Sequence, residues 1–103
     1  MKAPEEKPLF VPLAGEHYDA FIRGEKTKEF RLHGPRWNTK TCRVGREVTL
    51  SRGYGTTSRR AGAIVGVEII TDQTAFSPAF VACYTDRLTP SSECIAIEIQ
   101  LAK

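Results

Sequence analysis

The sequence predicts a small, mostly β domain of the α+β class, with five to six short strands and one or two short helices. Several stretches alternate apolar and polar residues with a period of two, which is typical of strands. One early stretch repeats its apolar residues every three to four positions, as an amphipathic helix does. A length of 103 residues with 41% hydrophobic residues fits a single domain with one modest core.

The first predicted strand covers residues 9 to 13 (LFVPL). Pro12 suits a strand at the edge of a sheet, because proline has no N–H to donate to a neighbouring strand. The eight residues before the strand, MKAPEEKP, carry charges and two prolines without apolar periodicity. We therefore expect a flexible N-terminal arm over residues 1 to 8, followed by a single domain over residues 9 to 103.

The stretch GEHYDAFIRG predicts a short helix. Tyr18, Phe21 and Ile22 are spaced to form one apolar face. Gly24 is placed to end the helix, because glycine adopts the left-handed conformation that commonly follows a helix.

From residue 27 the period changes to two, which predicts a strand that ends before the Gly-Pro pair at residues 34 and 35. Phe30 and Leu32 share one face of this strand and are expected to be buried. Glu29 and Arg31 share the opposite face.

Three further strands are predicted, at residues 47 to 52, 61 to 70 and 93 to 101. The second of these is β-branched and central in character, and its two glycines indicate a bulge or tight curvature. A flexible basic loop, GYGTTSRR, separates it from the strand before it. Residues 72 to 92 have no clear pattern, although a short helix near residues 80 to 84 and a turn at residues 89 to 92 fit best.

The composition also bears on location and cofactors. No run approaches the roughly 18 apolar residues of a membrane span, and the N-terminus lacks the apolar core of a signal peptide. Cys42, Cys83 and Cys94 are scattered, which predicts reduced thiols in a cytoplasmic protein. His17 and His33 have no ligand partners at metal-binding spacing, so we expect neither a metal nor another cofactor.

Positive charge is concentrated in one part of the chain. Residues 23 to 60 contain eleven of the fifteen lysines and arginines but only three acidic residues, a local balance of +8 within a net charge of +3. Such a skew predicts a face for an anionic partner, most often nucleic acid. The alternative is an ordinary solvated surface with uneven charge.

Lys26, Glu29 and Arg31 form the most specific cluster. Glu29 and Arg31 are two residues apart in a strand and point to the same face, and Lys26 lies at the turn just before it. Two cations beside a carboxylate favour its charged form. The three side chains then offer one acceptor and two donors to a planar polar ligand such as a nucleobase. A solvated strand face with weak surface ion pairs is the alternative.

Residues 24 to 31 (GEKTKEFR) match the pattern G-x-K-x-x-E-x-R, and the chain resembles the ASCH domains, which are small PUA-like β-barrels. The resemblance covers residues 9 to 101, since YDAFIRG, VGREVTLS, AGAIVGVEII and AIEIQL fit the family's helix and later strands. It implies a cleft beside the barrel that holds Lys26, Glu29 and Arg31. It also implies that the ligand is RNA, expected to be single-stranded, or a nucleoside or nucleotide.

Some small members of this family are amidohydrolases that act on N4-acetylcytidine, and a few are ribonucleases. The amidohydrolases share the lysine at position 26, have a threonine where this chain has Glu29, and take a further glutamate from the segment before the last strand. Residues 73 to 92 contain no glutamate, and Asp86 and Glu93 are imperfect substitutes. If the protein is an enzyme, Lys26 and Glu29 are the expected catalytic residues. The third hypothesis is a protein-interaction module that binds a larger protein partner.

Further candidate ligand contacts come from the basic loop and the segment after residue 34. Tyr54 lies between two glycines and is expected to stack on an unpaired base, and Trp37 is a second candidate. Each has an alternative, since Tyr54 could cap the end of the barrel and Trp37 could join the core. The remaining candidates at the rim of the cleft are Ser51, Arg52, Arg59 and Arg60.

Overall fold

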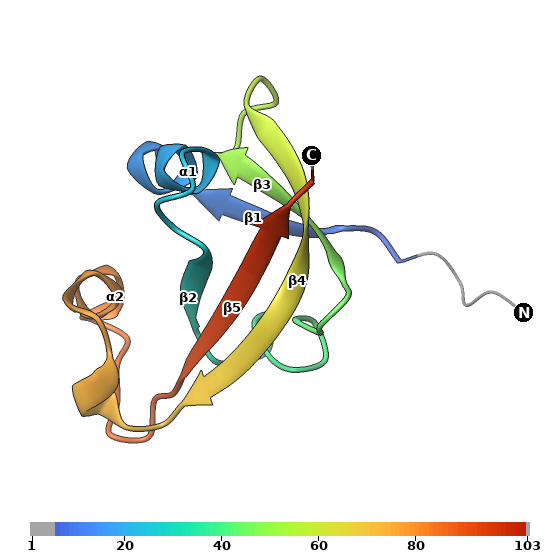
Figure 1. The fold of residues 1–103 in the computed structure, drawn as a ribbon. Helices are drawn as coiled ribbons and strands as arrows, with labels where there is room; N and C mark the ends of the chain where they lie inside the picture. Colours follow the sequence, from blue (N-terminus) through green and yellow to red (C-terminus); the bar gives the residue numbers. More distant parts are fainter. Residues whose placement is uncertain (1–5, 103) are drawn as a thin grey trace, which may run out of the picture.

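A computed structural model of the chain describes residues 6 to 102 (Figure 1). A five-stranded sheet curls into half of a barrel and carries two short helices, which confirms the predicted small, mostly β fold of the α+β class. In chain order the elements are β1 (Leu9–Leu13), α1 (Gly15–Ile22), β2 (Lys28–Leu32), β3 (Glu47–Arg52), β4 (Arg59–Ile70), a 3-10 turn (Gln73–Ala75), α2 (Pro78–Tyr84) and β5 (Cys94–Leu101).

The strand order is β1-β3-β4-β5-β2. Strand β1 runs parallel to β3, and the other neighbouring strands are antiparallel. Strands β1 and β2 are therefore the two edges, and the prediction that Pro12 lies in an edge strand is confirmed. Because these edges do not pair with each other, the half-barrel has an open side between them (Figure 1).

Strand β4 is central, as predicted, and its glycines shape it. Its register with β5 shifts between Ile64 and Gly66, which is the expected bulge. At Gly62 an added Cβ would lie 2.8 Å from the backbone oxygen of Gln100. The two strands therefore approach more closely than a side chain would allow.

Helix α1 ends as the sequence predicts. Gly24 has a φ of 78°. Its N–H donates to the carbonyl of Phe21 (3.1 Å), and the N–H of Glu25 donates to the carbonyl of Ala20 (2.9 Å), which together form a Schellman motif. Phe21 is buried, as expected, but the burial predicted for Ile22 is wrong, since that residue is 42% exposed at the end of the helix.

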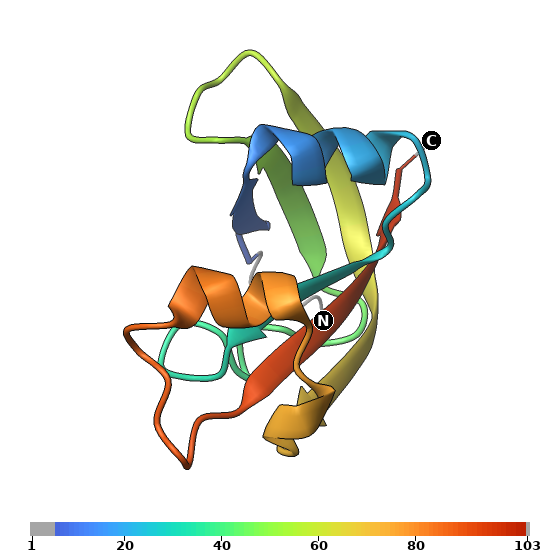
Figure 2. The ribbon, with the colours of Figure 1, turned by 90° about the vertical axis from the view of Figure 1, so that its left-hand side faces the viewer.

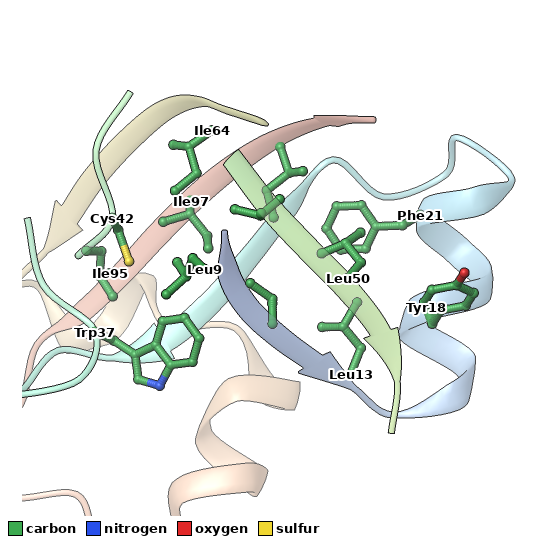
Figure 3. Close-up of a cluster of buried hydrophobic side chains, with 13 residues drawn as sticks. Leu9, Leu13, Tyr18, Phe21, Trp37, Cys42, Leu50, Ile64, Ile95 and Ile97 are labelled. Carbon is green, nitrogen blue, oxygen red and sulfur yellow. The ribbon is translucent and has the colours of Figure 1, made fainter. Parts of the chain in front are cut away.

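The main apolar core fills the inside of the half-barrel (Figure 3). It contains the inward residues of β1, β3, β4 and β5, the buried face of α1, and two residues of the segment between β2 and β3, Trp37 and Cys42. A smaller cluster of Phe76, Phe80 and Cys94 lies under α2. No helix among residues 6 to 102 is long and apolar enough to cross a membrane.

Strand β2 lies between these two clusters, and this position alters the predicted burial. Phe30 and Leu32 pack against the smaller cluster and are only partly buried. Glu29 is the most buried residue of the strand, at 8% exposed. The burial predicted for Phe30 and Leu32 is therefore only partial, because α2 covers their face of the strand, and the opposite face with Glu29 and Arg31 turns toward the opening of the half-barrel.

The structure also describes the segments that the sequence left open or assigned to the arm. Helix α2 and a turn closed by the Ser92 N–H donating to the Thr89 carbonyl (3.0 Å) lie where the weak pattern predicted them. Of the predicted N-terminal arm, residues 1 to 5 lie outside the described part. In the remainder, the Glu6 carboxylate pairs with the guanidinium of Arg43, and Arg46 donates to the Lys7 carbonyl (3.0 Å).

Candidate ligand-binding cleft

Lys26, Glu29 and Arg31 converge at the opening of the half-barrel. The Lys26 ammonium lies 3.0 Å from Oε1 of Glu29, and Arg31 donates to Oε2 through Nε (3.1 Å) and Nη2 (2.8 Å). Their side chains are 20%, 10% and 14% exposed, in that order. A carboxylate held in this way by two cationic side chains has a fixed position and orientation.

Arg31 has further partners that hold it in place. Its Nη2 also donates to the backbone oxygen of Pro12 (2.6 Å). Its guanidinium lies 4.6 Å from the centre of the Trp37 ring, within cation–π distance. Because Pro12 belongs to β1 and Arg31 to β2, this one side chain connects the two edges of the sheet.

Lys26 brings a fourth residue, His17, into the cluster. Its Nζ lies 3.2 Å from Nδ1 of His17. An ammonium has only donors, so Nδ1 is the acceptor and the ring proton lies on Nε2. That nitrogen lies 3.9 Å from a carboxylate oxygen of Glu16. His17 was not among the predicted site residues. Its signal in the sequence is its position one helical turn before the buried Phe21, on the side of α1 that faces the opening.

The cluster lines a cavity of about 390 Å³. Strand β2 lies between the two helices (Figure 2), and residues of all three elements line the cavity. We call this cavity the cleft; its other lining residues are Pro12, Leu13, Ala14 and Glu16 from the β1–α1 segment, Phe30 from β2, and Ser77, Ala79, Phe80, Cys83 and Tyr84 from the α2 segment.

The cleft combines a charged floor with an aromatic wall. The rings of Phe80 and Tyr84 are 4.9 Å apart on the α2 side. A hollow of about 440 Å³ between α1 and β5 is slightly larger, but neither Glu29 nor Arg31 lines it. The volume of the cleft lies within the usual range of small-ligand sites, and its convergent polar groups distinguish it from the other hollow.

This cleft is not lined by the predicted rim residues of the β3–β4 hairpin, which are Arg52, Tyr54, Arg59 and Arg60. Arg52 pairs with Asp19 of α1 (3.3 Å), and Arg60 donates to the backbone oxygen of Ala102 (2.8 Å). Tyr54 belongs to the β3–β4 loop, and Arg59 directly follows it. The end of β1 lies between this loop and α2 (Figure 2). Both residues lie outside the lining because the β3–β4 hairpin continues past α1 instead of folding over β2. A role in binding elsewhere stays a prediction.

Two further candidates are buried. Ser51 is 0% exposed, and its hydroxyl donates to the backbone oxygen of Gly55 (3.3 Å). Trp37 is 9% exposed and belongs to the main core (Figure 3), where its ring lies 4.6 Å from the guanidinium of Arg31. The β3–β4 loop therefore covers Ser51 and the core takes up Trp37, and their contact with a ligand stays a prediction.

The cysteines near the cleft differ in their surroundings. Cys83 of α2 is exposed and lines the cleft. Cys94 lies in the smaller apolar cluster, where burial raises the pKa of its thiol to about 11. Burial therefore makes the Cys94 thiol a weaker acid and shields it from reagents, whereas Cys83 is accessible to them. Residues 6 to 102 bring together no three His, Cys, Asp or Glu side chains that could hold a metal ion.

Comparison with known proteins identifies no family for the chain. No protein-family model matches the chain, and searches of curated proteins and of solved structures find no match.

Proposed function

We propose that this protein binds single-stranded RNA or a nucleotide in the cleft, as an ASCH-type domain. One observation carries the proposal: a carboxylate, Glu29, is held between Lys26 and Arg31 on the floor of a cavity of about 390 Å³. A volume of this size admits a nucleoside, and the three side chains offer it both donors and an acceptor.

The chemistry of the cleft suits a base with an attached phosphate. A Glu29 oxygen accepts from an exocyclic amino group or ring N–H, while the remaining N–H of Lys26 donates to a ring nitrogen or carbonyl oxygen. The apolar wall of Phe80 and Tyr84 contacts the face of the base. Lys26, Arg31 and the cations of residues 23 to 60 supply the positive potential that attracts phosphate.

Binding is tested by titrating the protein with a fluorescent single-stranded RNA and with mononucleotides at several salt concentrations. We expect the affinity to fall as salt rises, because phosphate contacts release counterions. Lys26→Met removes one donor from the cleft and is expected to weaken binding about tenfold or more.

Lys28→Met is the matched control. Lys28 is an exposed cation two residues away that lines a hollow on the other face of β2, beside Glu98. We expect this variant to bind almost as well as the unaltered protein. Equal losses in the two variants would mean that charge alone attracts the RNA, and an absence of binding at low salt would refute the proposal.

The second candidate function is hydrolysis of an N4-acetylated cytidine. The contacts of Lys26 with His17 (3.2 Å) and Glu29 (3.0 Å) favour it, because they place three groups that exchange protons in one row. Against it, the α2 segment contributes Ser77, Cys83 and Tyr84 to the cleft but no carboxylate. The cleft therefore offers fewer side chains to activate a water molecule or to stabilise an oxyanion during hydrolysis than it offers to hold the base of an intact nucleotide.

Incubation with N4-acetylcytidine, followed by chromatography of released cytidine, separates the two functions. We expect no turnover. Turnover that is lost in the Lys26→Met variant would reverse the ranking of the proposals. The same chromatography applied to the RNA ligand detects strand cleavage, which a ribonuclease would produce.

A further inference from the structure

Aromatic and cationic side chains lie together where the β3–β4 loop and the start of β4 meet the outer face of β1. Tyr54 is 78% exposed, and its ring centre lies 6.1 Å from that of Phe10 on β1. The guanidinium of Arg59 lies 5.1 Å from the centre of the Phe10 ring. We call these three residues the aromatic platform. None of them lines the cleft.

The aromatic platform adjoins the cleft through the end of β1. Leu9, Val11 and Leu13 are buried, so Phe10 and Pro12 share the outer face of β1 and lie about 7 Å apart along it. Pro12 lines the cleft. In addition, the N–H of Gly53, next to Tyr54, donates to the backbone oxygen of Leu13 (2.8 Å), which also lines the cleft.

The charge of the loop matches a nucleic-acid strand. Residues 52 to 60 contain three arginines and no acidic residue. Asp19 offsets the charge of Arg52. Arg59 has no acidic partner among residues 6 to 102, and the only hydrogen bond of its side chain within that range is from Nε to the backbone oxygen of Gly55 (3.2 Å). Its remaining N–H groups are therefore free to bind a phosphate.

We propose that the aromatic platform binds a second nucleotide of the strand whose neighbouring base enters the cleft. The second base stacks on Tyr54, and Arg59 binds the phosphate between the two sites. This inference rests on the proposed function of the cleft and narrows it: the ligand is a single-stranded oligonucleotide, bound across the end of β1, rather than a free nucleotide.

The test compares a mononucleotide, a dinucleotide and longer single strands with the unaltered protein and with Tyr54→Ala. Because Tyr54 is mostly exposed, this variant is expected to fold normally. We expect about a tenfold or greater loss of affinity for the oligonucleotides, which is the usual effect of removing one stacking aromatic. Affinity for the mononucleotide is expected to stay unchanged.

Two further variants make the test specific. Val44→Ala removes another exposed apolar side chain (67% exposed), away from the cleft and the aromatic platform, and is expected to have no effect. Arg59→Gln is expected to reduce the slope of log affinity against log salt by about one, as for the loss of one phosphate contact.

The outcomes separate this inference from the function of the cleft. Unchanged oligonucleotide affinity in Tyr54→Ala, or equally tight binding of duplex RNA, overturns the platform while leaving the cleft in place. If Tyr54→Ala weakens oligonucleotide binding but Lys26→Met changes neither ligand, the cleft is not the base site, and the proposed path across β1 fails with it.

Discussion

Replacing Arg31 with methionine tests whether the floor of the cleft is a buried, mutually supporting cluster. The change removes two hydrogen bonds to Glu29 and one to the Pro12 carbonyl. Hydrogen bonds to charged groups contribute about 1.5–3 kcal/mol each, and removing one partner of a buried ion pair costs about 3–5 kcal/mol. Since Lys26 still contacts the other Glu29 oxygen, we expect the lower end of that range, about 3 kcal/mol.

Thermal and urea unfolding followed by circular dichroism measure this loss. In a domain of this size each kcal/mol shifts the unfolding midpoint by about 4–8 °C, so we expect a decrease of about 12–24 °C. The double variant Glu29→Leu with Arg31→Met removes both charges. It is expected to be more stable than Arg31→Met alone, because no buried carboxylate then remains without the Arg31 guanidinium.

The chain contains a matched control. Arg23 and Glu25 are also two residues apart, and Nε and Nη2 of Arg23 each lie 2.9 Å from the Glu25 carboxylate. Their side chains are 55% and 62% exposed, so solvent screens the pair. Arg23→Met is expected to leave the unfolding midpoint unchanged within error. Equal shifts in Arg31→Met and Arg23→Met would refute the argument from burial.

Three other outcomes follow from the fold and are checked by the same unfolding measurements or by thiol labelling. Gly24→Ala places a side chain at a φ of 78° and is expected to lower the free energy of unfolding by about 1–2 kcal/mol. Gly34→Ala is the control and is expected to lower it much less, because no atom lies within 4 Å of the added carbon. Equal losses of stability in the two variants would contradict this reasoning. Gly62→Ala is expected to cost about 1–3 kcal/mol, because its Cβ meets the backbone of β5 at 2.8 Å; unchanged stability would show that the strands separate easily. Cys83 is expected to react with a thiol reagent in the folded protein and Cys94 only after unfolding. The folded state holds the Cys94 proton more tightly than the unfolded state does. The contribution of this thiol to the free energy of unfolding is therefore present below pH 9.0 and is lost as the pH rises through the folded pKa of about 11. Cys94→Val is expected to reduce this loss of stability at high pH.

The strands and the end of α1 could be predicted because local chemistry determines them. Val48 and Leu50 alternate with polar residues in strand β3, and its observed bounds coincide with the predicted ones. Gly24 adopts the left-handed conformation that a helix end requires. The cluster in the cleft was predictable for a similar reason, since a spacing of two residues places Glu29 and Arg31 on one face of any strand.

Features that depend on distant packing could not be predicted. Hydrophobicity alone places Phe30 and Leu32 inside, but the real environment of β2 depends on α2, which comes from a segment without periodicity. The position of Tyr54 depends on the direction of the β3–β4 hairpin relative to α1, and no short stretch of sequence encodes it. Trp37 was ambiguous for the same reason, because the path of a long loop decides whether an aromatic ring reaches the core.

The link between Arg31 and Pro12 also affects how copies of the chain behave toward one another. A half-open barrel exposes two strand edges, and exposed edges invite intermolecular pairing and aggregation. In β1, Pro12 has no N–H to offer an incoming strand, and its carbonyl already accepts from Arg31. The side chain that orders the floor of the cleft therefore also occupies an acceptor on the open edge of β1, and its replacement is expected to leave that edge more open to pairing between copies of the chain.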